Sequence, residues 1–346
     1  MEDIKTTPGN GHNDPKVFLA ITIDTEEDDW GCYTHNSFSL DNIQRIPRLQ
    51  DIFNKYGMLP TYFITYPVAT DEISIKILGK IAKEGRCEIG THPHPWNTPP
   101  IEEERNEQNS FINNLPSKLQ FEKIRTLHET ISRNFQVTPT SYRSGRWGFS
   151  DEVAKHLFRL GYLVDSSIMP YTDWSEYHGP DYSLLSAKSH ILNHEGSEYE
   201  SGRNPLIEIP STVGYLQMDQ EASNRLYYRI LRRPLKHFSI VGLLNRMKVL
   251  NRVWLSPEIS NGSNMVKLAE TMINNGHHLL NMFFHSSSLL ENSNPFVQTA
   301  KDLEEFFRRI EMFLAYACDR GIQPIKLSDA GIQIIQNFKD IRSITI

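Results

Sequence analysis

The sequence has few cysteines and no long apolar run. Its 346 residues include three cysteines, Cys32, Cys87 and Cys318, which lie far apart and show no paired spacing. This pattern is typical of reduced thiols in the cytosol rather than of a disulfide framework. No stretch approaches the ~18 uncharged apolar residues of a membrane-spanning helix. Residues 1–15 are polar and rich in turn formers, unlike a secretory signal, so we expect a flexible N-terminal segment on a cytoplasmic protein.

The sequence also lacks an excess of positive charge. Its formal net charge of −6 argues against a general nucleic-acid binder. There is no internal repeat and no low-complexity tract. No glycine-rich phosphate loop follows the first apolar segment, which disfavours nucleotide binding. With 39% hydrophobic and 23% charged residues, the composition is that of an ordinary globular protein with a full core.

What the sequence does contain is a repeated order of helix, glycine, short apolar strand and polar loop. This βα repetition predicts a parallel sheet whose polar loops share one edge. Seven or eight units favour closure into a barrel over residues 16–340, and an open doubly wound sheet is the alternative. Helices are expected at 41–53, 72–84, 117–134, 150–160, 264–275 and 300–319, and strands at 17–23, 59–65, 87–91, before 142, 162–164, 206–209, 279–284 and 322–327.

The segment 17–23 is apolar or β-branched throughout and then meets a cluster of carboxylates. Such a run predicts a strand buried on both faces. Asp24 and Glu26 are two residues apart, so on an extended backbone their side chains point the same way. Chemistry is commonly placed at this end of a strand in α/β folds, although a solvated acidic loop is the alternative.

Other predicted strands also end in residues that can bind a metal or take part in catalysis. His92 and His94 follow one strand, and Arg143 and His285 each follow another. Two histidines and a carboxylate are a common catalytic set for Zn²⁺ or another divalent cation. Taken singly, His-Pro-His-Pro-Trp could be a rigid turn, His285 a packed residue and Arg143 a surface ion pair. Their coincidence at strand ends favours a catalytic site.

These segments resemble the polysaccharide deacetylases, the family-4 carbohydrate esterases with the NodB-homology fold, and within them most of all the WalW-like branch. The resemblance lies in five ordered motifs at residues 22–28, 88–100, 142–150, 160–167 and 283–289. It covers residues 20–330. It implies a distorted (β/α)7-type barrel of parallel strands with outer helices. It also implies a divalent metal, most often Zn²⁺, and removal of acetyl groups from amino sugars.

The resemblance also implies roles for individual residues. Asp24 matches the general base, Arg143 the arginine that pairs with it, and His285 the general acid. Glu26 matches the metal-ligand carboxylate, and His92 and His94 match the metal histidines. Two departures are visible: better-known members have adjacent aspartates instead of Asp-x-Glu, and histidines four apart, where this chain has Trp96. Asp24 and Glu26 could therefore exchange roles.

Further residues beyond the strand ends are candidates for substrate contacts. Flat rings suit sugar faces, although ordinary packing is the alternative for them, and a backbone N–H near Gly145 could hold an oxyanion. A buried acid could orient His285 or a metal ligand. The rings are Trp96, Trp147, Tyr171 and Trp174, and the acids are Asp165 and Glu208.

The segment 225–252 departs from the βα rhythm because it is basic, amphipathic and free of acidic residues. One hypothesis is that it docks on an anionic membrane surface or on the diphosphate of a lipid-linked sugar, which would place the protein at the inner membrane face. The alternative is a solvated helical insertion at about 220–260 that packs on the barrel.

We therefore expect a metal-dependent N-deacetylase acting on a glycan, glycolipid or nucleotide- or lipid-linked precursor. The alternatives are a metal amidase acting on a non-sugar amide and a non-catalytic carbohydrate-binding barrel. A glycosidase using Asp24 and Glu26 is disfavoured, because neighbours on one strand poorly straddle a glycosidic bond.

Overall fold

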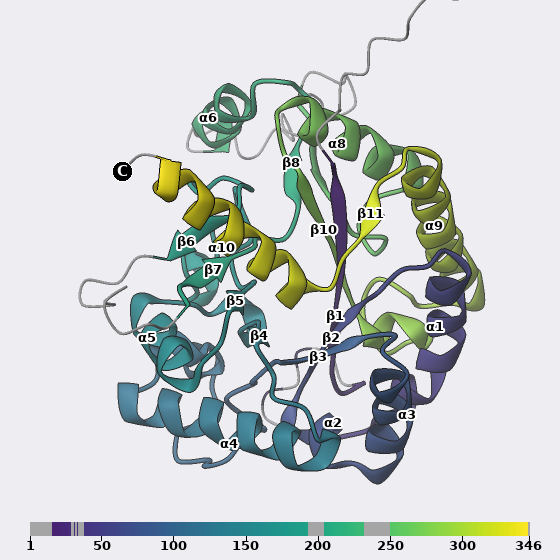
Figure 1. Cartoon of the computed structure of the whole chain (residues 1–346). Coiled ribbons are helices and arrows are strands. Elements are labelled where there is room, and N and C mark those ends of the chain that lie inside the picture. Colours follow the sequence, from purple (N-terminus) through teal and green to yellow (C-terminus); the bar gives the residue numbers. More distant parts are fainter. Residues whose placement is uncertain are drawn as a thin grey trace, which may run out of the picture.

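A nine-stranded sheet forms the centre of the molecule in the computed structural model, which describes residues 16–28, 31, 33, 38–192, 204–231 and 250–344. Its main path runs β10-β1-β2-β3-β4-β5-β7-β6, with β11 beside β1, and each pairing except β6–β7 is parallel (Figure 1). The strands are β1 (Phe18–Thr25), β2 (Thr61–Ile64), β3 (Glu88–Thr91), β4 (Ser141–Tyr142), β5 (Val164–Asp165), β6 (His190–Leu192), β7 (Leu206–Glu208), β10 (Leu279–His285) and β11 (Gln323–Pro324).

The sheet curls into a half-barrel whose open side is bridged by backbone contacts. The Thr212 N–H, just after β7, donates to the carbonyl of Asn281 on β10 at 3.0 Å. Leu255 N–H donates to the Thr212 carbonyl at 2.8 Å, and Phe283 N–H donates to the Leu255 carbonyl at 3.1 Å. The predicted distorted α/β barrel is confirmed, and the open doubly wound alternative is wrong.

The residues of β1 alternate between the two faces of the sheet, as its apolar sequence predicts. Leu19, Ile21 and Ile23 are buried in the core shared with the outer helices. Ala20 faces the barrel interior with Phe63 of β2 and residues of β5 and β7. Further along β1, Thr22 and Asp24 reach the same interior, so polar groups succeed apolar ones towards the carboxyl end of the barrel.

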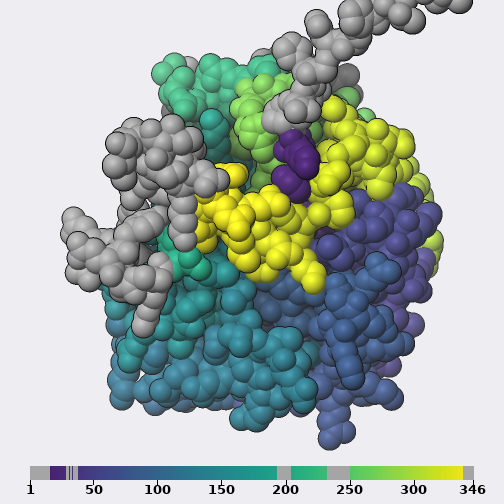
Figure 2. All heavy atoms as spheres, in the orientation of Figure 1, coloured from purple at the N-terminus to yellow at the C-terminus, as the bar shows by residue number. Residues whose placement is uncertain are grey.

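Helices cover the outside of the sheet, and the bounds of the six predicted ones agree with the structure within a few residues (Figure 1). The helices Tyr66–Thr70 and Leu327–Ile344 were not predicted. The helix α10 crosses the amino ends of the strands and contacts β1, β5 and β7. Figure 2 shows its atoms covering this face of the barrel. The helices are α1 (Ile46–Lys55), α2 (Tyr66–Thr70), α3 (Glu72–Lys83), α4 (Ser117–Phe135), α5 (Asp151–Leu160), α6 (Gln220–Leu231), α8 (Gly262–Asn274), α9 (Ala300–Asp319) and α10 (Leu327–Ile344).

Other parts of the chain also differ from the predicted elements, and strand β6 is one that was not predicted. The strand expected at 322–327 is reduced to Gln323–Pro324, since proline cannot donate to a ladder, and α10 begins at Leu327. A two-stranded antiparallel ribbon, β8 (Val213–Tyr215) with β9 (Arg252–Trp254), was not predicted, because three-residue strands carry little pattern.

The range 220–260, expected to be a helical insertion, thus begins as helix α6 and includes strand β9. Most of the basic segment 225–252, at 232–249, lies outside the described residues, as does the expected N-terminal segment 1–15. Among the described residues, no helix combines the length and apolarity needed to cross a bilayer.

Candidate metal centre and active site

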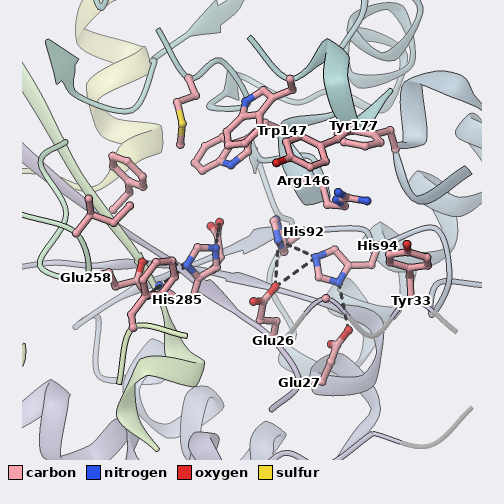
Figure 3. Close-up of a pocket in the computed structure, with 18 of the residues that line it drawn as sticks. Glu26, Glu27, Tyr33, His92, His94, Arg146, Trp147, Tyr177, Glu258 and His285 are labelled. Carbon is pink, nitrogen blue, oxygen red and sulfur yellow. Dashed lines mark hydrogen bonds and ion pairs between the residues drawn. The ribbon is translucent and has the colours of Figure 1, made fainter. Parts of the chain in front are cut away.

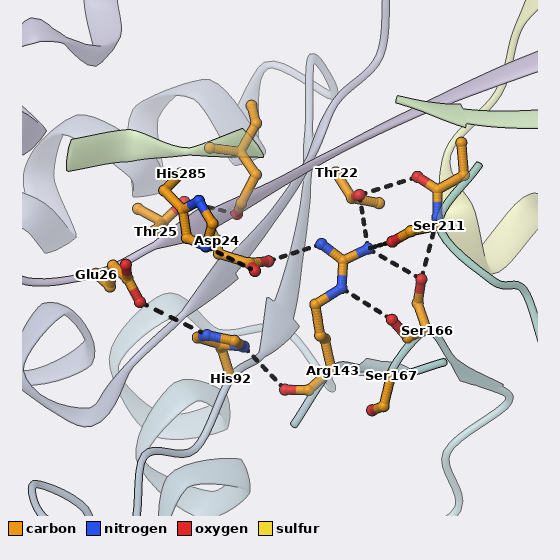
Figure 4. A network of polar contacts seen from close by, with 12 residues as sticks. Thr22, Asp24, Thr25, Glu26, His92, Arg143, Ser166, Ser167, Ser211 and His285 are labelled. Atoms are coloured by element: carbon orange, nitrogen blue, oxygen red, sulfur yellow. Dashed lines mark hydrogen bonds and ion pairs between the residues drawn. The ribbon is translucent and has the colours of Figure 1, made fainter. Parts of the chain in front are cut away.

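The carboxyl ends of β1, β3 and β10 bring together the residues that the sequence singles out. Asp24 on β1 is in register with His285 on β10, and His92 follows the last residue of β3. Glu26 lies one residue beyond β1, where its backbone N–H donates to the Ser286 hydroxyl at 3.1 Å. Figures 3 and 4 show these side chains pointing into one cavity. The predicted convergence of distant segments is therefore present.

Glu26, His92 and His94 form a compact buried triad of ligand atoms, all within 4.8 Å of one another. The Nε2 atoms of the two imidazoles are 3.2 Å apart. Oε2 of Glu26 lies 3.3 Å from Nε2 of His94 and 3.8 Å from Nε2 of His92. Ligands at ~2.05 Å from a tetrahedral cation are about 3.3 Å apart, so the triad has the size of such a site.

The hydrogen bonds behind the two imidazoles fix their tautomers. Nδ1 of His92 donates to the Arg143 carbonyl at 2.9 Å, and Nδ1 of His94 donates to Oε1 of Glu27 at 3.2 Å. Both Nε2 atoms therefore turn lone pairs towards each other, an arrangement that a shared cation would stabilise. Burial lowers the pKa of His92 and raises the pKa of Glu26 to about 7. The donor set fits a divalent metal with three protein ligands, and a carboxylate ligand would be ionised by it.

The ring of His94 is held by packing as well as by Glu27. The Trp96 indole stacks on it with ring centroids 4.1 Å apart and planes 25° from parallel. Glu27 also accepts a hydrogen bond from the Asn97 amide and from the Thr65 hydroxyl. Trp96, predicted to contact substrate, thus lines the cavity and supports a candidate ligand at the same time.

Gly145 supports His94 from the other side. Its own N–H donates to the Pro93 carbonyl at 3.2 Å and is already engaged, and the expected oxyanion contact by a backbone N–H near Gly145 stays a prediction. A Cβ at this position would lie 2.2 Å from Cδ2 of His94 and 2.9 Å from the Pro93 carbonyl oxygen. The glycine is needed because the backbone passes directly against the imidazole.

Replacing Gly145 with alanine is therefore expected to displace His94. We expect metal binding, measured by competition with a chelator, to weaken about 10–100-fold, as for other losses of ligand support. Gly79→Ala is the matched control, because a Cβ there has no neighbour closer than Phe135 at 3.9 Å. Equal metal affinities for the two variants would contradict this role of Gly145.

Arg143 pairs with Asp24 inside the barrel. Its Nη1 donates to Oδ1 of Asp24 at 2.7 Å, and its guanidinium also donates to Thr22 and Ser166 (Figure 4). Burial alone would raise the pKa of Asp24, but the Arg143 guanidinium, helped by His92 and His285, brings the pKa below its ordinary value. Asp24 is consequently a carboxylate held in one orientation, which suits a general base.

His285 is held by Glu258, a residue that the sequence did not single out. Nδ1 of His285 lies 3.1 Å from Oε2 of Glu258, and Nε2 lies 3.7 Å from Oδ2 of Asp24. The backbone N–H of His285 also donates to Oε1 of Glu258 at 3.0 Å. Burial alone would lower the pKa of His285, but Glu258, with Glu26 and Asp24, raises the pKa to about 9. His285 is therefore an imidazolium at neutral pH, as a general acid must be.

The acids expected to orient His285 do something else. Asp165 accepts hydrogen bonds from the backbone and hydroxyl of Ser167, and Glu208 accepts one from the Ile168 N–H. Burial raises the pKa values of both carboxyls, and the neighbouring Asp165 raises the pKa of Glu208 further. They shape the loop after β5 rather than contacting His285, so that interpretation is wrong.

Asp24, His285 and the Glu26–His92–His94 triad line a cavity of about 530 Å³ with largely aromatic walls, whereas Arg143, which pairs with Asp24, does not (Figure 3). Trp147 and Trp174, which were predicted to contact substrate, also line it, whereas Gly145 does not. Tyr171 is buried in a separate cluster against Tyr215, so ordinary packing is the correct alternative for it. The other aromatic lining residues are Tyr33, Trp96, Phe111, Tyr177, Trp254, Phe283 and Phe296.

The wall contains two consecutive left-handed residues that are not glycine. Arg146 has φ 53° and Trp147 has φ 63°. Such conformations cost on the order of 1–3 kcal/mol each, and they persist where surrounding packing enforces them, often at functional sites. Here they turn both side chains into the cavity.

The fold and the site define a class: an α/β half-barrel similar to that of the NodB-type polysaccharide deacetylases, with a buried Glu/His/His set. A structure named as a polysaccharide deacetylase from Mycobacterium smegmatis matches with a TM-score of 0.55 and 13% identity over 98% of this chain and 96% of that chain. Another so named, from Pseudomonas aeruginosa PAO1, matches with a TM-score of 0.50 and 11% identity over 92% and 90%.

The same fold also occurs in a 4-alpha-glucanotransferase from Thermococcus litoralis, with a TM-score of 0.52 and 11% identity. That match covers 91% of this chain and 40% of the other. No protein-family profile and no curated protein matches the sequence. These likenesses establish the fold, and the chemistry must be argued from the site.

Proposed function

We propose that this protein is a metal-dependent hydrolase that removes N-acetyl groups from amino sugars of a glycan, a glycolipid or a lipid-linked precursor. One observation carries the proposal: a cation-sized Glu26–His92–His94 triad lines the same cavity as the His285–Glu258 pair and as Asp24, whose carboxylate Arg143 binds. Amide hydrolysis needs these three functions, namely an activated water, a base and an acid for the leaving amine.

Each side chain has a definite task in this proposal. The triad would hold a divalent cation, most readily Zn²⁺ for a His₂Glu set, which would supply an acidified water and a polarised acetyl carbonyl. Asp24 takes the proton of the attacking water, and Arg143 keeps its carboxylate ionised and oriented. His285 gives a proton to the amine nitrogen as the C–N bond breaks, and Glu258 keeps it protonated. Because Glu26 and not Asp24 lies against both imidazoles, this geometry favours Glu26 as the ligand.

Replacing Glu258 with glutamine is expected to change the pH dependence of the reaction. With the pKa of His285 at about 9, the imidazolium, and with it kcat, persists through neutral pH and falls as the pH rises through about 9. Without the Glu258 charge, the pKa falls towards the ordinary value of ~6.5, so kcat at pH 8 drops about 30-fold and much less at pH 6. The measurement is a pH–rate profile.

Glu258→Asp is the matched variant, because it keeps the charge and should keep most of the alkaline activity. If kcat falls at the same alkaline pH in wild type and in Glu258→Gln, His285 is not the general acid. The His285–Glu258 pair also stabilises the folded protein. Because the pKa of His285 in the folded state is raised, this contribution is present below about pH 6.5 and is lost as the pH rises through about 9.

The direct test is acetate release from a panel of N-acetylated sugars by metal-reconstituted protein, with Asp24→Asn as the blank. Turnover of a non-sugar amide alone would support the amidase alternative. A protein that purifies without stoichiometric metal and releases no acetate would be a non-catalytic barrel. A glycosidase is disfavoured, because Arg143 engages Asp24 and two histidines engage Glu26.

Three finer proposals accompany this one: membership of the WalW-like branch, a cytoplasmic location, and contact of the segment 225–252 with an anionic membrane surface. The last is supported by Arg225 and Arg229 on α6 and by Arg252 on β9. Flotation with vesicles of anionic lipid at low salt would test it, and absence of binding would remove it.

A further inference from the structure

Arg146 occupies an unusual place in the cavity wall. It is the only lysine or arginine among the described residues that line the cavity. Its guanidinium carbon lies 4.4 Å from the centroid of the Phe111 ring and 5.7 Å from that of Tyr33. Figure 3 shows it on the cavity wall, across from Glu26, the ligand candidate. The Phe111 and Tyr33 rings hold the planar guanidinium in one orientation.

The charge of Arg146 is weakly matched by the protein. Its acidic neighbour is Glu107, at 3.6 Å from Nη2, whose side chain is 41% exposed. The Ser110 hydroxyl accepts one further N–H. A guanidinium has five N–H donors. Among the described residues, Glu107 and Ser110 engage only part of them, so most of these donors remain for a ligand.

The carboxylates of the cavity, by contrast, have partners within the site or belong to the proposed metal centre. Asp24 pairs with Arg143, and Glu258 pairs with His285. Glu27 accepts from Asn97 and His94, and the charge of Glu26 would be matched by the cation that the triad is proposed to hold. Arg146 is therefore not needed to neutralise these carboxylates, and its guanidinium can bind an anionic ligand.

The remaining walls are largely aromatic or apolar. Phe283, Trp254, Phe296 and Met169 line the cavity together with Tyr33 and Tyr177. A planar guanidinium suits the paired oxygens of a carboxylate or phosphate better than scattered hydroxyls.

We infer that the substrate is an N-acetylated amino sugar that carries an anionic oxygen group, a carboxylate or a phosphate, and that the Arg146 guanidinium binds this group. The inference rests on the proposed function, because the acetamide must reach the Glu26–His92–His94 end of the cavity. It makes Arg146 a determinant of specificity.

The test compares kcat/KM for acetate release from N-acetylglucosamine, its 1-phosphate, its 6-phosphate and N-acetylmuramic acid. We expect an anionic sugar to be preferred at least about 10-fold over the neutral one, as a charged hydrogen bond implies. Arg146→Gln should reduce that ratio about 10-fold or more, and Arg146→Lys should restore part of it. The phosphate and carboxylate arms identify the anion. A preference for the neutral sugar, or a ratio unchanged in Arg146→Gln, would overturn the inference.

A binding measurement separates this inference from the proposed function. Titration calorimetry of metal-loaded Asp24→Asn protein with the same four sugars gives affinity ratios that need no turnover. Absence of acetate release with anion-selective binding would refute only the deacetylase, whereas release without anion selectivity would refute only the Arg146 site. If Arg146→Gln does not fold by circular dichroism, the ratio in Arg146→Lys decides, and it should be smaller than in wild type.

Discussion

Replacing Asp24 with asparagine is expected to lower kcat by about 10²–10⁴-fold, the usual contribution of a positioned acid or base. Asparagine keeps the size of the side chain and can accept a hydrogen bond from Arg143, but it cannot take a proton from water. The pKa of Asp24 lies below its ordinary value, so this loss should persist across neutral and mildly acidic pH. The measurement is acetate release under saturating substrate.

Metal content decides how the result is interpreted. Asp24 lies outside the triad, so the Asp24→Asn protein should bind metal as wild type does. Loss of both metal and activity would show that Asp24 is a ligand, which is the exchange of roles that the sequence left open. Full activity in this variant would exclude Asp24 as the base.

Replacing His92 with alanine is expected to remove both metal and activity. The change takes away one of three donors and leaves the Arg143 carbonyl without the N–H that it now accepts. We expect stoichiometric metal, measured by elemental analysis after dialysis, to fall to trace levels and acetate release to fall at least about 10³-fold, because the acidified water would be lost as well.

His128→Gln is the matched control for His92→Ala. His128 hydrogen-bonds to the Tyr162 hydroxyl at 3.1 Å, lies on α4 and does not line the cavity. This variant should keep metal and activity near wild-type levels. Retention of stoichiometric metal by His92→Ala would contradict the proposed centre.

The sequence predicted the features that depend on local pattern. The apolar run before Asp24 and the two-residue spacing to Glu26 follow from strand geometry, and glycines after helices mark the βα units. The convergence of His92, Arg143 and His285 follows from parallel strands that end at one edge. These inferences need no knowledge of side-chain packing.

The features that were missed depend on contacts between distant segments. Glu258 follows a three-residue strand in a ribbon with no repeating pattern, so nothing local marks it as the partner of His285. Gly145 looks like a free loop glycine until the His94 ring is placed against it. Asp165 and Glu208 were assigned to the wrong partner, because sequence cannot show that their carboxyls turn towards the loop after β5.

Arg143 joins the two halves of the site through different parts of one residue. Its guanidinium fixes Asp24, while its backbone carbonyl fixes the tautomer of His92. A side-chain substitution at 143 would therefore disturb proton transfer and leave the imidazole bond in place. A movement of the backbone at 143 would alter both together, so the distance between the base and the cation-binding group is set by a single rigid span of main chain.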